Sequence, residues 1–361
     1  MKFLSLILAG FFILAPLMAC ASPEQALQAI QLPKGFTAEI YAHVPGARSL
    51  EVAPDINTIF VGTRGNKVFA IDMETREPRI YMRGLKAGNG IAYRDGYLYI
   101  AEQHRIIRAS TDGSRELKVL FSRLPDNPWH GWRYATFGPD GRLYIAVGSP
   151  CNICTPRDLQ GTIIALTLPD GKPEIVAIGI RNSVGLAFHP IIKKLYFTDN
   201  GADDMGDDSP PDELNRLDFP GQNFGFPWYG GGTDRTPDFA GEALPEQELT
   251  PPVLSFGAHV APLGLHFYSG SQFPIEYQNN AFVAQHGSWN RSIPVGYRVM
   301  RIQLDASGNP VSREPFLEGW LRGETKLGRP VDIAELPGGS LLVSDDMNGV
   351  IWRISYEAGV N

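Results

Sequence analysis

One structural unit recurs six times along this chain, and this repetition restricts the fold more than any other feature. Each copy contains an apolar strand, a turn rich in Pro, Asp and Gly, an aliphatic and aromatic strand that ends in small or acidic residues, and a strand with a basic residue. The early copies are spaced by about 40 to 50 residues, the length of a four-stranded propeller blade. We therefore predict an all-β fold, a six-bladed β-propeller of four-stranded antiparallel sheets. The first two strands of the copies lie at 50–55 and 59–62, 91–96 and 97–101, 135–141 and 143–147, 185–190 and 195–199, 264–268 and 280–284, and 331–339 and 341–345.

The composition and the ends of the repeat agree with a closed propeller. The 39 Gly and 29 Pro, together with 13 Tyr, 19 Phe and 6 Trp, suit short strands joined by many tight turns. The segment 36–41 has the pattern of a lone strand that completes the last blade near Tyr356, which would remove an open sheet edge. Extra residues between about 201 and 262 lengthen the later copies, and insertions of this kind fall in loops on one face, often the binding face.

The N-terminal segment has the pattern of an export signal. Lys2 precedes an apolar run over residues 3–18, which is short for a membrane span, and small residues surround Cys20. We predict a signal peptide at 1–20, a linker at 21–32 and the propeller domain at 33–361. Residues 17–20 fit either a lipobox, which would anchor the mature protein through a lipid on Cys20, or an ordinary cleavage site. In both alternatives the protein is exported, and we expect it in the periplasm.

Two of the three cysteines lie close together, at Cys151 and Cys154. In an oxidising compartment they can pair as a disulfide, which would leave Cys20 either lipidated or removed with the signal. Free thiols are the main alternative. A zinc site is a weaker interpretation, because the sequence has no second Cys pair and no His pair at zinc-finger spacing.

Charged residues point to a small anionic ligand rather than a nucleic acid. The formal net charge of −7 gives no electrostatic reason to expect nucleic acid. In a propeller, the residues just before the innermost strand of each blade converge on one mouth of the central channel. Crowded cations repel one another, so several arginines at that mouth would most simply face an anion, although any one of them alone also fits a solvated or carboxylate-paired residue. The residues at this position of the repeat are Arg48, Asn89, His130, Arg133, Arg181, Asn182, His259 and Arg329.

An acidic stretch at 199–208 follows the second strand of the fourth repeat, and Asp212 and Glu213 come shortly after it. Hard oxygen ligands at this density suggest calcium. The spacing does not match an EF-hand loop, and a solvated acidic loop is the alternative.

Several motifs together resemble a known family. They are Gly-Ile-Arg-Asn-Ser-Val-Gly-Leu-Ala-Phe at 179–188, Thr-Asp-Asn-Gly at 198–201, Asp-Glu-Leu-Asn at 212–215, Gly-Gln-Asn-Phe-Gly-Phe-Pro at 221–227, and the turn around His130. Over about residues 33–356 the chain resembles the soluble aldose (glucose) dehydrogenases that use pyrroloquinoline quinone (PQQ). It is most similar to their sorbosone dehydrogenase-like branch, which also has a stretch like residues 148–154.

The resemblance implies a role for several residues. His130 would be the catalytic base, while Arg181 and Asn182 would contact the quinone oxygens. Arg329 would help to bind the carboxylates of PQQ. The backbone carbonyls of Gly201 and Ala202 would ligate a calcium ion that touches the quinone.

The chain also departs from the family pattern. Asn89 stands where the glucose enzymes have a glutamine, and Arg291 is the candidate to replace a cofactor-binding lysine. Trp129 replaces an aspartate beside the catalytic histidine, which leaves both glucose specificity and the partner that orients the histidine open. Trp228, Tyr229 and Trp289 are candidates to stack on a sugar ring.

The activity implied is oxidation of a sugar, a sugar-derived aldehyde such as sorbosone, or an alcohol. Hydride would pass to PQQ, and a cytochrome or a quinone would then accept the electrons. Two other functions remain open because propellers support unrelated chemistries. One is a calcium-dependent lactonase or esterase, and the other is a non-catalytic module that binds a glycan or a peptide.

Overall fold

A computed structural model of the chain describes residues 22–114 and 116–359. The predicted signal peptide and Cys20 lie outside the described residues, so export and lipidation stay predictions. No helix in the described part of the chain has the length and apolar character that a membrane crossing requires.

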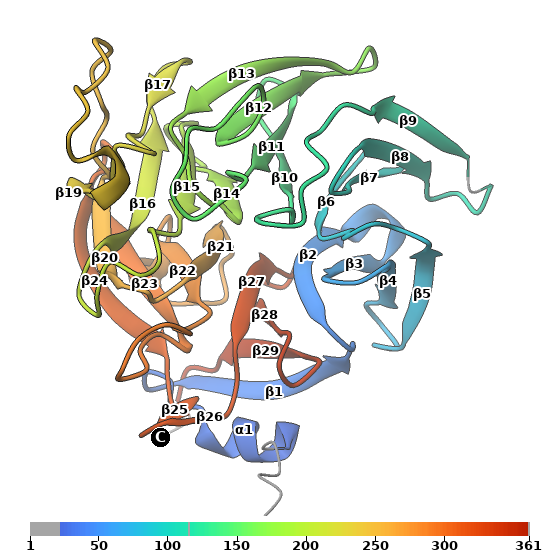
Figure 1. Cartoon of the computed structure of the whole chain (residues 1–361). Helices are drawn as coiled ribbons and strands as arrows, with labels where there is room; N and C mark the ends of the chain where they lie inside the picture. Colours follow the sequence, from blue (N-terminus) through green and yellow to red (C-terminus); the bar gives the residue numbers. More distant parts are fainter. Residues whose placement is uncertain (1–21, 115, 360–361) are drawn as a thin grey trace, which may run out of the picture.

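Six four-stranded antiparallel sheets surround a central channel (Figure 1), which confirms the predicted propeller. The innermost strands are β2 (Ala47–Ala53), β6 (Gly90–Arg94), β10 (Tyr134–Phe137), β14 (Gly185–Phe188), β21 (Pro262–Phe267) and β27 (Pro330–Glu335). The second strands are β3 (Thr58–Thr63), β7 (Tyr97–Ala101), β11 (Leu143–Val147), β15 (Leu195–Asp199), β22 (Ala281–Gln285) and β28 (Leu341–Asp345). The third strands are β4 (Lys67–Asp72), β8 (Ile106–Ser110), β12 (Thr162–Thr167), β16 (Pro211–Leu217), β23 (Arg298–Leu304) and β29 (Val350–Tyr356). The outermost strands are β5 (Pro78–Arg83), β9 (Leu117–Phe121), β13 (Lys172–Ile178), β20 (Leu254–Ala258), β24 (Pro310–Leu317) and β1 (Phe36–His43).

Each inner strand contacts the inner strands of the two neighbouring blades, so the six form a closed ring. The second strands β11 and β22 are buried along their whole length, because every blade packs between two others. This packing explains why these strands are apolar at consecutive positions rather than at alternate ones. The cores of the molecule therefore lie between blades.

The first strand of the propeller closes its last sheet. Strand β1 pairs antiparallel with β29, and Phe36 lies opposite Tyr356, as predicted. The ring is thus completed by backbone hydrogen bonds between the two ends of the chain, which leaves β29 without an open edge.

Shorter elements decorate this frame. The segment predicted as a linker contains helix α1 (Pro23–Ala29), which begins with a capping box between Ser22 and Gln25 and buries Ala26. The long insertion contributes β17 (Gln222–Asn223), which extends the third sheet in parallel with β13, and the hairpin of β18 (Tyr229–Gly231) and β19 (Asp234–Arg235). The remaining elements are the hairpin of β25 (Leu321–Arg322) and β26 (Thr325–Lys326) and the short helices η1 (Pro54–Ile56), η2 (Pro237–Phe239) and η3 (Ile275–Tyr277).

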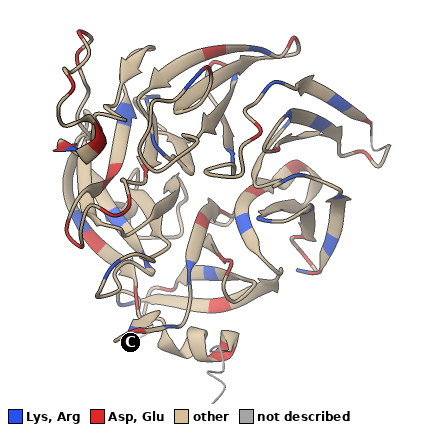
Figure 2. Ribbon diagram, viewed as in Figure 1, with Lys and Arg blue, Asp and Glu red and all other residues tan. Residues whose placement is uncertain are grey.

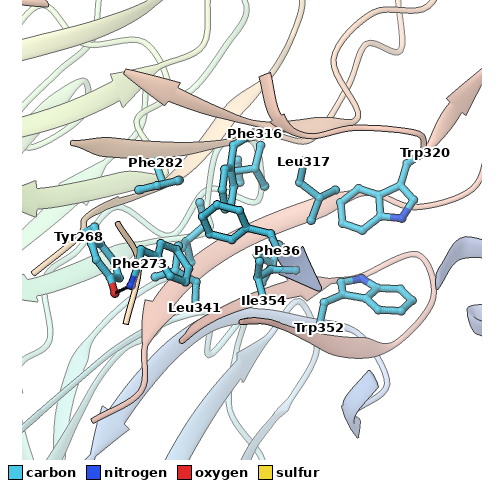
Figure 3. Close-up of a cluster of buried hydrophobic side chains, with 14 of the residues drawn as sticks. Phe36, Tyr268, Phe273, Phe282, Phe316, Leu317, Trp320, Leu341, Trp352 and Ile354 are labelled. Carbon is cyan, nitrogen blue, oxygen red and sulfur yellow. Dashed lines mark hydrogen bonds between the residues drawn. The ribbon is translucent and has the colours of Figure 1, made fainter. Parts of the chain in front are cut away.

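The closing strand is also fixed by an aromatic cluster. The ring of Phe36 lies among the buried rings of the last two blades (Figure 3). It makes edge-to-face contacts with four rings, at centroid distances of 4.7 Å to Phe273, 5.1 Å to Tyr277 and 5.0 Å to both Phe316 and Tyr356. Such contacts add to the stabilisation from burial alone.

We expect Phe36→Ala to lower the free energy of unfolding by about 3 kcal/mol or more. Loss of the aromatic side chain would leave a cavity in the core at the place where β1 closes the propeller. Urea denaturation followed by fluorescence measures this change. Phe219→Ala is the control, since Phe219 is 63% exposed, and it should change the stability by no more than about 0.5 kcal/mol. Equal effects of the two variants would contradict the role of Phe36 in closure.

Candidate active site

A cavity of about 430 Å³ opens at the mouth of the channel where the inner strands begin. Six of the eight residues predicted to converge there line it, namely Arg48, His130, Arg181, Asn182, His259 and Arg329. Charged residues of both signs occur on every blade (Figure 2), so the cations of the cavity are a local feature.

Asn89 and Arg133 are not among the residues that line the cavity, and the prediction that Asn89 binds a cofactor stays a prediction. Asn89 is buried, and its side chain accepts from Arg48 Nε at 3.0 Å and donates to the carbonyl of Arg133 at 2.8 Å. The buried Arg133 guanidinium donates to the carbonyls of Gln103, Pro125 and His130. These two side chains hold the turn that carries His130 and do not reach the cavity.

Arg291 also lies away from the cavity. Its guanidinium donates to the carbonyl of Asp207 and forms an ion pair with Asp208 at 2.8 Å. The carboxylate and carbonyl of the acidic loop attract the side chain, whereas its neighbours Trp289 and Asn290 line the cavity. The structure therefore gives no support to Arg291 as a cofactor ligand.

His130 occupies a left-handed turn, with φ of 49°, at the cavity wall. Its Nδ1 lies 3.1 Å from the carbonyl oxygen of Ser149. Because a carbonyl only accepts, Nδ1 carries the hydrogen in this contact, and Nε2 is left as the basic nitrogen. Ser149 thus supplies the orienting partner that the replacement of an aspartate by Trp129 left open.

The electrostatic surroundings keep this imidazole neutral. Burial, followed by the nearby positive charge of Arg181, lowers the pKa of His130 to about 3. A neutral histidine with a free Nε2 can accept a proton from a hydroxyl group.

Arg181 is held from several sides. Its Nε donates to the Asn152 carbonyl at 3.0 Å, Nη1 to the Asn200 carbonyl at 3.1 Å, and Nη2 to Asn152 Oδ1 at 2.7 Å and to Asp203 at 2.8 Å. Four of the five N–H groups of the guanidinium are therefore used, and one on Nη1 remains for a ligand.

The backbone beneath Arg181 is fixed by a buried carboxylate. Asp199 accepts from the N–H groups of Arg181 and Asn182 at 2.9 and 2.6 Å. Burial raises the pKa of Asp199 above its ordinary value. The amide side chain of Asn182 lines the cavity and has no hydrogen-bond partner among the described residues.

Arg329 and Arg64 are the two cavity cations without a carboxylate partner in the described chain. Arg329 donates to the carbonyls of His286 and Gly287 at 3.1 and 3.0 Å, and Arg64 lies 4.3 Å above the ring of Trp132. Burial lowers the pKa of Arg329, and the charges of Tyr297 and Asp346 each raise it more than the charge of Arg64 lowers it. An anion between the two guanidiniums would stabilise both positive charges.

Arg64 is not among the residues predicted from the sequence, although its position in the repeat indicates the same mouth. Arg64 follows the second strand of its blade, whereas the predicted residues precede the first strands. Thr63 pairs with Ala47 in the antiparallel sheet, so the end of β3 and the start of β2 meet at the same mouth. Arg64 and Arg48 therefore both line the cavity.

The acidic stretch is mostly committed to hydrogen bonds. Asp203 pairs with Arg181, and Asp212 accepts from the N–H groups of Gly201 and Ala261 at 2.7 and 2.8 Å. No group of three or more His, Cys, Asp or Glu side chains that could hold a metal occurs in residues 22–114 and 116–359. Gly201 lines the cavity, and the buried Ala202 follows it.

Tryptophans flank the entrance. Trp129 is 50% exposed, Trp289 is 67% exposed, and both line the cavity together with Trp132. Of the three rings predicted to stack on a sugar, only Trp289 lines the cavity. Trp228 packs against Phe239, and Tyr229 lines a separate, smaller pocket.

Comparison with known proteins gives the family. An uncharacterised protein of Borreliella burgdorferi is 35% identical over 356 residues, which cover 92% of this chain and 93% of that protein. A PQQ-dependent pyranose dehydrogenase of Coprinopsis cinerea is 31% identical over 127 residues, 30% of this chain and 17% of that enzyme. The solved PQQ domain of the pyranose dehydrogenase from C. cinerea has the same fold, with a TM-score of 0.76 and 19% identity over 90% of this chain and 97% of that domain. The family model for glucose/sorbosone dehydrogenases matches residues 93–353, which is most of the chain, and this protein therefore belongs to that family.

Proposed function

We propose that this protein is a quinoprotein dehydrogenase that binds PQQ at the channel mouth and oxidises a sugar, a sugar-derived aldehyde or an alcohol. The observation that carries the proposal is the pair of guanidiniums, on Arg64 and Arg329, that share one cavity without a carboxylate partner in the described chain. Membership of the glucose/sorbosone dehydrogenase family supports it. A lactonase that coordinates calcium through carboxylates would not require these cations.

The residues of the cavity fit PQQ. This cofactor is a flat quinone with several carboxylates, which suit Arg64 and Arg329 as ligands. The remaining N–H of Arg181 and the free amide of Asn182 would hold a quinone oxygen. When bound, the cofactor supplies the electrophilic carbon that accepts hydride.

His130 would act as the general base. Its Nε2 accepts the proton of the substrate hydroxyl, while the Ser149 carbonyl keeps Nδ1 protonated and the ring in place. The resulting imidazolium would lie next to Arg181, which disfavours it. A bound polyanion offsets that repulsion, so we expect the pKa of His130 to rise towards neutrality in the complex.

Calcium would be held jointly by the protein and the cofactor. The carbonyl oxygens of Gly201 and Ala202 accept no hydrogen bond from the described residues, so their lone pairs are available as hard oxygen ligands. Calcium takes about six to eight oxygens, and two carbonyls are too few. The other ligands would come from the cofactor and water, and the two should therefore bind cooperatively.

The entrance favours a ring-shaped substrate. The exposed rings of Trp129 and Trp289 offer apolar surfaces in the cavity that also contains the base, which suits stacking on a sugar. A cytochrome or a quinone would take up the electrons, and export to the periplasm would fit the N-terminal segment.

The proposal is tested by titrating the calcium-loaded protein with PQQ and then measuring dye reduction over a panel of sugars, aldehydes and alcohols. We expect binding that weakens by about ten-fold or more when calcium is chelated, and activity that falls by about 100-fold or more in His130→Ala. Cofactor affinity should persist in this variant.

His43→Ala is the control, because His43 is exposed on β1, and it should keep full activity. Absence of PQQ binding at micromolar concentration would refute the proposal and favour a lactonase, an esterase or a binding module. Binding without dye reduction would refute the dehydrogenase activity.

The neutral state of His130 predicts a pH dependence of stability in the cofactor-free protein. The folded protein keeps the imidazole unprotonated down to a pKa of about 3, whereas the unfolded chain takes up a proton near 6.5. Acid therefore favours unfolding between these values. From pH 7 to pH 5 the wild type should lose about 1 to 2 kcal/mol more stability than His130→Gln. Urea denaturation at both pH values measures this difference, and parallel losses would contradict it.

The position of Arg64 in the cavity gives a further prediction. Arg64→Ala should weaken PQQ binding by about ten-fold and reduce its salt dependence, because one charge-assisted contact is lost. Arg322→Ala is the matched control, since Arg322 is an exposed residue of β25 that does not line the cavity. An unchanged affinity in Arg64→Ala would mean that this cation does not face the cofactor.

A further inference from the structure

The short loop 148–154, which follows β11, touches both reacting groups of the proposed site. It contains Cys151 and Cys154, whose sulfurs form the predicted disulfide across a Cα separation of 6.1 Å. The loop contains no strand or helix residues, so regular backbone pairing does not determine its shape.

Asn152, inside the disulfide ring, makes half of the contacts of the Arg181 guanidinium. Its carbonyl accepts from Nε at 3.0 Å and its Oδ1 from Nη2 at 2.7 Å. The same side chain is itself fixed, because Oδ1 accepts from Asp203 N at 2.8 Å and Nδ2 donates to the Asp203 carbonyl at 3.0 Å. Asn152 therefore joins Arg181 to the carboxylate that pairs with it.

Ser149, at the other end of the loop, holds His130. Both its carbonyl and its hydroxyl oxygen lie 3.1 Å from Nδ1. The Ser149 hydroxyl donates to the Cys151 carbonyl at 2.9 Å, and its N–H donates to the Arg181 carbonyl at 2.8 Å. The hydroxyl is thereby tied to the disulfide ring itself.

The loop also has little room to move. A Cβ on Gly148 would lie 2.5 Å from Cβ of His130, so the backbone there packs directly against the histidine. The disulfide closes a ring that contains only Asn152 and Ile153 between the cysteines, which restricts the conformations that the loop can adopt.

We propose that Ser149 and Asn152 are positioning residues, and that the Cys151–Cys154 disulfide keeps His130 and Arg181 in register with each other. The catalytic meaning of this inference rests on the proposed function. The positioning of the two side chains does not depend on that function, because the contacts exist in the protein without a ligand. The ligand affected would be the anionic quinone held by Arg181.

The first experiment uses the cofactor-free protein. Nitrogen-15 NMR of the side chains reports exchange of the Arg181 Nε–H with water and the tautomer of His130. In the Cys151→Ser, Cys154→Ser double variant, we expect the Nε–H of Arg181 to exchange at least about ten-fold faster and His130 to populate both tautomers. Unchanged signals in a folded variant would overturn the proposal.

The second experiment measures PQQ affinity. Asn152→Ala should weaken binding by about ten-fold or more, because the guanidinium loses one anchor of the set that orients it. In an Arg181→Ala background the same change should have an effect within about two-fold, since a residue that acts through Arg181 cannot act without it. Additive losses would assign Asn152 a role independent of Arg181.

Asn280→Ala is the matched control. Asn280 is also buried and accepts from a buried guanidinium, that of Arg301 at 3.1 Å, in a blade interior away from the cavity. It should lower stability and leave PQQ affinity within about two-fold. If the wild type binds no PQQ, the proposed function fails, and the NMR experiment still decides whether the loop fixes the two side chains.

Discussion

The closed ring of six inner strands is the constraint on which the rest of the structure depends. A buried carboxylate in the channel links three of its blades. Asp332 in β27 accepts from the N–H of Leu50 in β2 at 2.8 Å and from the hydroxyl of Tyr134 in β10 at 3.0 Å. Burial raises the pKa of Asp332 to about 7, so these donors offset part of the cost of placing a carboxylate there. Because the ring is closed, residues from blades far apart in the sequence meet at one mouth.

This geometry explains how much of the site could be predicted. The repeat gives the position of the inner strands, and position alone brings Arg48, His130, Arg181 and Arg329 to one cavity. Position does not tell which way a side chain turns. Arg291 turns towards Asp208, a contact that depends on the folded path of the long insertion.

Asn89 and Arg133, in the interior, also show that position in the repeat does not determine what a side chain contacts. Each is at the predicted place in the repeat, but hydrogen bonds to other parts of the protein hold its side chain away from the cavity. Helix α1 and strand β17 were not predicted, because each is short and is stabilised by packing or pairing with distant parts of the chain. Local sequence patterns do not contain this information.

The cations that line the cavity are of two kinds: those paired with a carboxylate of the protein, and those without an ion pair in the described chain, which are available to a ligand. Asp346 accepts from Arg48 at 2.7 Å and from His286 at 2.8 Å, and this buried group is balanced internally. Burial lowers the pKa of His286 to about 4, so it remains a neutral donor to the carboxylate. Arg64 and Arg329 form no ion pair in the described chain, although the charge of Asp346 acts on both, and both line the cavity.

The pairing of β1 with β29 has a consequence for the order of assembly. The strand that closes the ring, β1, precedes every other strand of the propeller in the sequence, whereas its partner β29 follows all of them. A chain that lacks β29 cannot close the ring, so the last sheet can form only after all six blades have been synthesised.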